Sequence, residues 1–262
     1  MIRFLVLILV ACAHRPALVW HDEFDGAAGA SYDTTKWRPD VGGDGMGNQE
    51  RELYTAHDNA VLDGNGHLVI TARPIDPAST ETCWYGKCLY TSGRIHTHGH
   101  FAHAYGRFEA RIKIPRGQGM WPAFWLLGDN MDSAGWPDGG EIDIMENVGK
   151  EPRAVHGTVH GPGYSGDGGI GGGDTLPAGS YADDFHVYAV EWRPDEIRWF
   201  VDGRPYFRLT PANLPAGKRW VYDHPFFVIL NLAVGGGWPG DPDGSTVLPQ
   251  EMIVDYVRVY SL

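Results

Sequence analysis

The sequence has few basic residues, and they form no basic stripe. Lysine and arginine number 21 against 33 aspartates and glutamates, which gives a formal net charge of −12 at pH 7. Binding to nucleic acid depends on neutralising phosphate groups with clustered lysine and arginine, so this composition argues against a nucleic-acid partner. A protein with this charge is also repelled by polyanionic polysaccharides.

The sequence also lacks an apolar run that is long enough to cross a bilayer. Near the N-terminus, Arg3 precedes an apolar stretch at positions 4–10, which is too short for a membrane span and is typical of a secretion signal. The tetrapeptide LVAC, which ends at Cys12, resembles a bacterial lipobox, in which the cysteine is acylated and becomes the new N-terminus. We expect residues 1–17 to be a signal peptide of this lipoprotein type with a short linker, and the mature protein to be lipid-anchored at a membrane surface of the cell envelope. An ordinary signal peptide, and hence a secreted protein, is the alternative.

Only three cysteines occur in 262 residues. Besides Cys12, the segment CWYGKC contains Cys83 and Cys88, with no further thiol or histidine adjacent to complete a metal site. Two closely spaced cysteines in an exported protein predict a disulfide, and a reduced pair is the alternative.

Convincing helical patterns are absent, and 36 glycines and 18 prolines favour many turns between short strands. Positions 105–114 alternate polar and apolar side chains, which predicts a half-buried strand. Positions 225–234 are mostly apolar, which predicts a central strand buried on both faces. Further strands and hairpins are predicted at positions 61–73, 185–201, 204–209 and 252–260. No linker divides the chain, so we expect residues 18–262 to form a single β-sandwich domain of two antiparallel sheets.

Three carboxylates stand close together in the segment GEIDIMENV. On a regular strand, Glu141 and Asp143 share one face, while Glu146 falls on the opposite face among isoleucines. A lone carboxylate buried there is costly, so we predict a one-residue β-bulge near Ile144 or Met145 that returns Glu146 to the face of the other two. An edge strand with solvated acids is the alternative.

Two carboxyl groups on one face have the chemistry to hydrolyse a glycosidic bond. Strand positions four pleat steps apart are separated by roughly 13 Å between Cα atoms, and long side chains that lean together can reach the ~5–5.5 Å between carboxyls that retaining hydrolysis needs. One acid must be ionised and the other protonated, and repulsion among clustered acids favours that division. Ten tryptophans and twelve tyrosines fit a carbohydrate partner, since sugar rings stack on flat aromatic faces.

Positions 140–148 resemble the catalytic strand of glycoside hydrolase family 16, in the bulged form typical of laminarinases. The motifs WPAFW at 121–125, YGRFEAR at 105–111 and HGTVHGP at 156–162 are also similar to those of the family. The resemblance extends from about residue 20 to residue 260. It implies an all-β jelly-roll sandwich of two curved antiparallel sheets, similar to concanavalin A, with a substrate cleft on the concave face.

The resemblance also implies roles for individual residues. Glu141 matches the nucleophile, Glu146 the acid/base, and Asp143 a helper carboxylate that holds and tunes the nucleophile. The positions that match substrate-binding residues are Asn48, Arg94, Trp121, Trp125, His160 and, at the rim, Trp238. Core packing is the alternative for Trp121 and Trp125, and a structural role is the alternative for His160.

Many members of the family bind calcium on the convex side. The matching positions are Glu23, a backbone oxygen at Gly66, and Asp255, which offer the oxygen ligands that hard cations prefer. No cofactor is implied for the chemistry. The resemblance implies an endo-acting, retaining hydrolase of β-1,3-glucan or of mixed-linkage β-1,3-1,4-glucan. We expect a monomer, although the sequence does not decide the oligomeric state. The alternatives are a transglycosylase or galactan hydrolase of the same fold, and a non-catalytic β-glucan-recognition protein, which would be expected to lack one of the glutamates.

Overall fold

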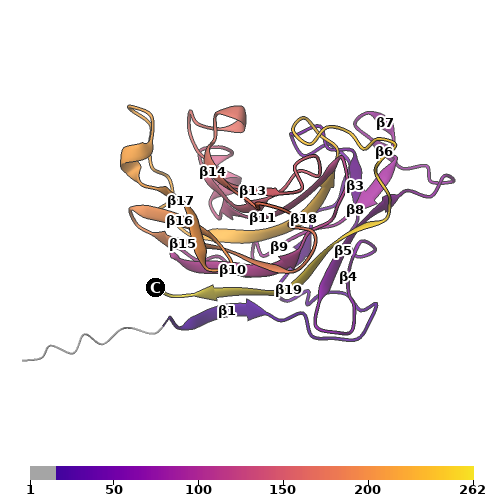
Figure 1. Ribbon diagram of the computed structural model, residues 1–262, viewed down its shortest axis with the longest axis horizontal. Coiled ribbons are helices and arrows are strands. Elements are labelled where there is room, and N and C mark those ends of the chain that lie inside the picture. Colours follow the sequence, from indigo (N-terminus) through magenta and orange to yellow (C-terminus); the bar gives the residue numbers. More distant parts are fainter. Residues whose placement is uncertain (1–15) are drawn as a thin grey trace, which may run out of the picture.

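The computed structural model describes residues 16–262, which form two large β-sheets that pack face to face (Figure 1). The larger sheet has ten strands in the order β17-β16-β15-β10-β19-β5-β8-β3, with β1 added beside β19 and β4 beside β5. Its strands are β1 (Leu18–Asp22), β3 (Glu52–Tyr54), β4 (Ala60–Leu62), β5 (Leu68–Pro74), β8 (Tyr90–Ser92), β10 (Gly106–Lys113), β15 (His186–Arg193), β16 (Glu196–Val201), β17 (Arg204–Leu209) and β19 (Gln250–Tyr260).

The smaller sheet has seven strands in the order β14-β13-β12-β11-β18-β9-β2. Its strands are β2 (Arg38–Pro39), β9 (Arg94–His96), β11 (Met120–Gly128), β12 (Glu141–Glu146), β13 (Ala154–His160), β14 (Ile170–Thr175) and β18 (Phe226–Val234). β6 (Thr82–Cys83) and β7 (Gly86–Lys87) form a separate two-stranded hairpin. The strands pair antiparallel except for β3 and β8, which run parallel. The predicted all-β sandwich is therefore confirmed.

The core lies between the two sheets and follows the alternation of the sequence. On β10, Phe108, Ala110 and Ile112 are fully buried, and on β11 Phe124 and Leu126 face them from the other sheet. Each large apolar side chain removed from water in this way contributes roughly 1.5–3 kcal/mol to the folded state. The residues between them are only partly buried, namely Arg107, Glu109 and Arg111 on β10 and Trp125 and Leu127 on β11, so they belong to the outer faces of the sheets.

The strand predictions hold where the alternation or the turn chemistry is strong. The predicted hairpins appear as β4 paired with β5 and as β15 paired with β16. All nine residues of β18 are buried, as expected for a central strand. The described helical segments are single turns in loops, namely α1 (Met131–Ala134) and the 3₁₀ turns η1 (Gly166–Gly168) and η2 (Pro211–Asn213).

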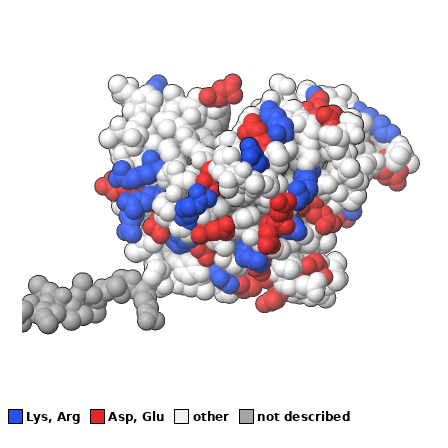
Figure 2. Space-filling model, in the orientation of Figure 1, with Lys and Arg blue, Asp and Glu red and all other residues white. Residues whose placement is uncertain are grey.

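The outer face of the seven-stranded sheet is a hollow between raised loops. Figure 2 shows a notch between the two raised ends of the molecule, and acidic and basic side chains intermingle over the visible face. Within residues 16–262, no helix has the length and apolar character needed to span a membrane. The predicted lipid-bearing Cys12 lies outside the described residues.

Candidate active site

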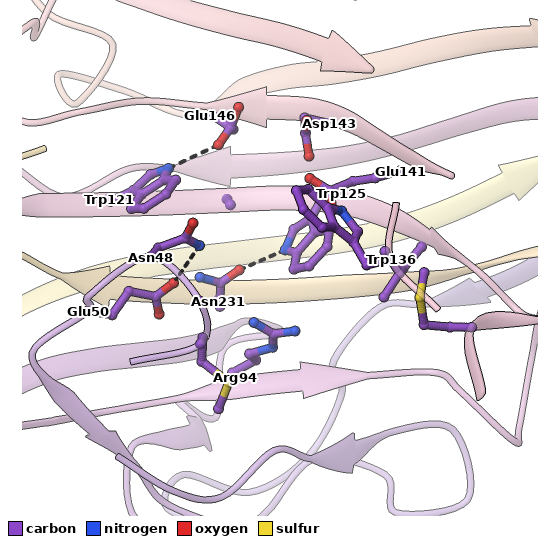
Figure 3. A pocket seen from close by; sticks show the side chains of 15 residues that line it. Asn48, Glu50, Arg94, Trp121, Trp125, Trp136, Glu141, Asp143, Glu146 and Asn231 are labelled. Atoms are coloured by element: carbon purple, nitrogen blue, oxygen red, sulfur yellow. Dashed lines mark hydrogen bonds between the residues drawn. The ribbon is translucent and has the colours of Figure 1, made fainter. Parts of the chain in front are cut away.

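A pocket of about 440 Å³ opens on the outer face of the seven-stranded sheet (Figure 3). It contains all three predicted catalytic carboxyls and four of the predicted sugar-binding side chains. Its lining residues are Met46, Gly47, Asn48, Glu50, Arg94, Trp121, Ala123, Trp125, Leu127, Met131, Trp136, Glu141, Asp143, Glu146 and Asn231.

The bulge predicted in β12 is present at Ile144. Along the pairing with β11, Phe124 faces Met145 and Trp125 faces Asp143, so Ile144 is left without a partner. Ile144 is 1% exposed and packs into the core. The extra residue restores the parity of the strand and brings Glu146 onto the outer face with Glu141 and Asp143, where Figure 3 shows the three carboxyls gathered.

The start of β12 is fixed by a glycine. Gly140 has a φ of +77°, and a Cβ at this position would lie 2.9 Å from the ring of Phe226. Only glycine meets both demands without strain, so this turn sets the point at which Glu141 enters the sheet.

Each of the two predicted catalytic glutamates accepts a hydrogen bond from a tryptophan indole. Trp121 Nε1 donates to Glu146 Oε1 at 3.1 Å, and Trp136 Nε1 donates to Glu141 Oε2 at 2.9 Å. Trp121 comes from the adjacent strand β11, whereas Trp136 comes from the loop before β12 and is 51% exposed. Sequence reasoning missed Trp136; its position in a Gly-rich segment just before the acids was the available signal.

His160 lies beside the other edge of the acid cluster. It faces Glu141 across the β12–β13 pairing. Its Nε2 lies 3.3 Å from Asp143 Oδ2 and 3.7 Å from Glu141 Oε1. The ligand atoms of these three residues lie within 4.8 Å of one another, the closest approach to a cation site in the described residues. His160 does not line the pocket, and its predicted contact with substrate near the nucleophile stays a prediction.

Burial and mutual repulsion control the charge of the cluster. Burial raises the pKa of Glu141 to about 8, and the charge of Asp143 adds to this rise while His160 opposes it. Burial raises the pKa of Asp143 to about 7 and that of Glu146 well above its usual range. The three carboxyls therefore do not all ionise together near neutral pH, and they titrate as a coupled set. A protonated acid beside an ionisable one is the arrangement that a carboxylate nucleophile with a general acid requires.

One wall of the pocket carries the predicted sugar-binding groups. Trp125 Nε1 donates to Asn231 Oδ1 at 2.8 Å, and the Arg94 guanidinium lies 4.9 Å from the Trp125 ring. Asn48 Nδ2 donates to Glu50 Oε1 at 3.0 Å. Sequence reasoning did not select Glu50 or Asn231 as site residues, because their place depends on strands far apart in the chain.

The predicted rim residue Trp238 does not line the pocket itself. Its ring packs edge-on against Trp121 with centroids 5.6 Å apart, and also against His156 at 5.3 Å. Its backbone oxygen accepts a hydrogen bond from Lys150. Trp238 therefore braces the tryptophan that holds Glu146.

The predicted disulfide between Cys83 and Cys88 is present and closes the β6–β7 hairpin. The turn of this hairpin holds the segment that leads into the pocket wall. Trp84 Nε1 donates to the backbone oxygen of Glu50 at 2.7 Å, and Tyr85 Oη donates to that of Arg51 at 2.5 Å.

The residues predicted to bind calcium fit a cation poorly. Both carboxylate oxygens of Glu23 accept hydrogen bonds from Arg258, at 2.9 and 2.7 Å. Asp255 Oδ2 accepts one from Arg111 at 2.6 Å. The backbone oxygen of Glu23 does lie near Gly66, 3.8 Å from where a Cβ would stand. A calcium ion stays a prediction here, and it would have to compete with two arginines for these carboxylates.

Comparison with known proteins agrees with this geometry. The model of the family described as "Glycosyl hydrolases family 16" matches residues 47–258. A β-glucanase of Rhodothermus marinus is 44% identical over 98% of this chain and 93% of its own length. The laminarinase catalytic domain of Thermotoga maritima superimposes with a TM-score of 0.87 at 46% identity, covering 94% of this chain and 98% of that one. The endo-β-1,3-glucanase of Pyrococcus furiosus gives a TM-score of 0.85 at 49% identity, covering 94% of each chain. Since the family model spans most of the sequence and the bulged acid strand lies in a cleft of the same sandwich, the chain belongs to glycosyl hydrolase family 16.

Proposed function

We propose that the protein is a retaining endo-hydrolase of β-1,3-glucan, or of mixed-linkage β-1,3-1,4-glucan, that acts by double displacement. The observation that carries this proposal is the bulge at Ile144, which gathers Glu141, Asp143 and Glu146 in one pocket. The β-glucanase, laminarinase and endo-β-1,3-glucanase relatives support a β-glucan as the substrate.

In the first step, a Glu141 carboxylate oxygen attacks the anomeric carbon and the glycosidic bond breaks. Glu146 transfers its proton to the departing oxygen, so the leaving sugar departs as a neutral alcohol. Burial and the charges of Asp143 and Glu141 raise the pKa of Glu146, which keeps on Glu146 the proton that a general acid must supply. The glycosyl group is then bound to Glu141 as an ester.

In the second step, water replaces the leaving sugar. Glu146, now ionised, accepts a proton from the water. The water oxygen attacks the anomeric carbon, and the bond between that carbon and Glu141 breaks. Two inversions give net retention. His160 Nε2 lies beside both Glu141 and Asp143, and it favours the ionised form of the nucleophile because it opposes the rise in the pKa of Glu141.

The stereochemistry of the first product tests this mechanism. Proton NMR of a fresh digest of laminarin should show the β-anomer before mutarotation. An α-anomer appearing first would mean inversion, and the roles given to Glu141 and Glu146 would be wrong.

Substrate choice is tested by reducing-sugar release from laminarin, barley glucan, agarose and carrageenan. We expect the glucans to be cleaved fastest, because a net charge of −12 disfavours sulfated polymers. Faster turnover on carrageenan than on laminarin would overturn the glucan assignment.

We further propose that Cys12 carries lipid and holds the enzyme at the cell envelope. The LVAC tetrapeptide supports this proposal. Cys12→Ser should move the protein from the membrane fraction to the soluble fraction, with the wild type as control. A wild-type protein that is already soluble and begins near Ala17 would favour an ordinary signal peptide.

A further inference from the structure

A second pair of buried acids lies at the pocket wall, outside the predicted catalytic strand, and only Glu50 of the pair lines the pocket. Glu50 and Glu52 are 3% and 1% exposed. Glu50 accepts hydrogen bonds from Asn48 Nδ2 at 3.0 Å and from Tyr54 Oη at 2.9 Å, one on each carboxyl oxygen (Figure 3 shows the first). Glu52 Oε2 accepts a hydrogen bond from the backbone N–H of Val234 at 2.6 Å. Glu52 Oε1 is buried and has no hydrogen-bond donor among the described residues.

A buried oxygen without a donor is costly if the carboxyl is ionised, and it is satisfied if the oxygen carries a proton. Burial raises the pKa of Glu52 well above its usual range, and Glu50 raises it further through repulsion and through a side-chain hydrogen bond. Glu50 has lone pairs left to accept such a bond, because a carboxylate offers about four acceptor positions and two are in use.

The other charged groups around the pair do not neutralise it. Burial raises the pKa of both Tyr54 and Tyr85, and the charge of Glu52 adds to each rise, so neither phenol supplies a compensating charge. Arg94 acts on Tyr54, but its Nε lies 2.7 Å from Asp40, which engages its charge.

The remaining cation next to the pair is also engaged. Arg51, which separates the two acids in the sequence, is bound by Asp241 through two hydrogen bonds at 2.8 and 3.0 Å. A proton is therefore the available partner for the free oxygen of Glu52.

We infer that Glu52 is held as a neutral carboxylic acid that donates its Oε1 proton to Glu50, and that this shared proton positions the sugar-binding wall of the pocket. The inference rests on the proposed function for the identity of the ligand. Glu52 itself does not line the pocket, so it is a positioning residue that acts through Glu50.

The contacts of Glu50 connect it to two amides of the pocket wall, directly to Asn48 and through Tyr54 to Asn231. One oxygen fixes the amide of Asn48. The other fixes Tyr54 Oη, which lies 3.3 Å from the Asn231 Nδ2 donor, and Asn231 in turn accepts the bond from Trp125. Ionisation of Glu52 would place two negative charges together, and we expect Glu50 to shift and to release these groups.

The sign of the pH dependence follows from the raised pKa. A carboxyl that is harder to ionise in the folded state than in the unfolded state makes the protein less stable as pH rises from the unfolded pKa toward the folded one. An uncharged amide in the same place has no such dependence. Glu52→Gln should therefore be at least as stable as the wild type near neutral pH, and its advantage should widen on the alkaline side.

The test compares the same substitution at the two adjacent acids. Kinetics on laminarin and thermal melting without substrate are measured from about pH 6 to about pH 9.5 for the wild type, Glu52→Gln and Glu50→Gln. Near pH 6, Glu52→Gln should keep the wild-type KM, because its amide N–H replaces the donated proton. Glu50→Gln should raise KM about five- to tenfold with kcat much less changed, because its amide N–H opposes the donors of Asn48 or Tyr54. On the alkaline side, both proteins keep the pH dependence of the catalytic cluster, and the wild-type KM should rise more steeply than that of Glu52→Gln.

Two results would overturn the inference. The first is a Glu52→Gln protein that is unfolded, or impaired near pH 6 as strongly as Glu50→Gln, because Glu52 would then be needed as a charge. The second is a rise in KM and a fall in melting temperature on the alkaline side that are equally steep in Glu52→Gln and in the wild type. The melting curves need no substrate, so a wild type that cleaves no glucan would refute the proposed function and still leave the state of Glu52 decided by its stability.

Discussion

The two indole donors in the pocket provide a direct way to separate the roles of the two glutamates. Trp136 donates to Glu141 at 2.9 Å and Trp121 donates to Glu146 at 3.1 Å. Replacing either tryptophan by phenylalanine removes the N–H and keeps an aromatic ring. Each donor stabilises the ionised form of its carboxyl, and so lowers the pKa of that carboxyl.

The size of the effect follows from the strength of these hydrogen bonds. A hydrogen bond to a charged group contributes about 1.5–3 kcal/mol, and 1.36 kcal/mol corresponds to one pKa unit. Trp136 is 51% exposed, so solvent weakens its contribution, and we take the lower end of the range. Loss of either donor should thus raise the pKa of its glutamate by about one unit.

The assay is the pH dependence of kcat/KM on laminarin, which reports the ionisations of the free enzyme. Trp136→Phe should move the acidic limb upward, because the nucleophile becomes harder to ionise. Trp121→Phe should move the alkaline limb upward, because the acid holds its proton to higher pH. If Trp136→Phe leaves the acidic limb in place while Trp136→Ala weakens substrate binding, the ring is only a sugar-stacking surface. If both variants move the same limb, the assignment of nucleophile and acid is wrong.

Further predictions concern the catalytic residues and the two structural features. Glu141→Ala should abolish measurable turnover. Glu146→Ala should lower the rate on glucan about 10²–10⁴-fold but keep activity on an activated aryl glycoside. Added azide should give this variant a β-glycosyl azide product, and an α-azide product would contradict retention. Asp143→Asn should fold normally and lower kcat less than either glutamate change, and an equal or larger loss would give Asp143 a more direct role. Replacing Cys83 and Cys88 together by serine should cost about 2 kcal/mol of stability and raise KM more than it lowers kcat, because the hairpin holds the pocket wall; an unchanged KM would show that the wall is held without it. Melting temperatures in excess calcium and in excess chelator test the predicted calcium site, which should raise the melting temperature if the ion displaces the two arginines; equal curves would show that it does not.

The sequence by itself determined the fold class and the strand that brings three acids together. The alternation along β10 and the apolar run of β18 are local patterns, and both strands are present at the positions that these patterns predict. The bulge at Ile144 could also be deduced locally, since three acids that share one face conflict with the parity of a regular strand. The disulfide followed from two neighbouring cysteines in an exported protein.

Only the tertiary structure decided what each acid touches. The partner of Glu146 is 25 residues away in the sequence, and Trp125 meets Asn231 across 106 residues. Such contacts depend on the order of strands in the sheet, which periodicity does not encode. Glu52 shows the same limit for burial, because a glutamate on a short strand is expected to be solvated until the sheet closes over it. The ion pairs of Glu23 with Arg258 and of Asp255 with Arg111 likewise depend on the pairing of β19 with β1 and β10, which the sequence does not show. A local pattern records which side chains share a face, but the charge and hydrogen bonding of a carboxyl are set by atoms that the fold brings from elsewhere in the chain.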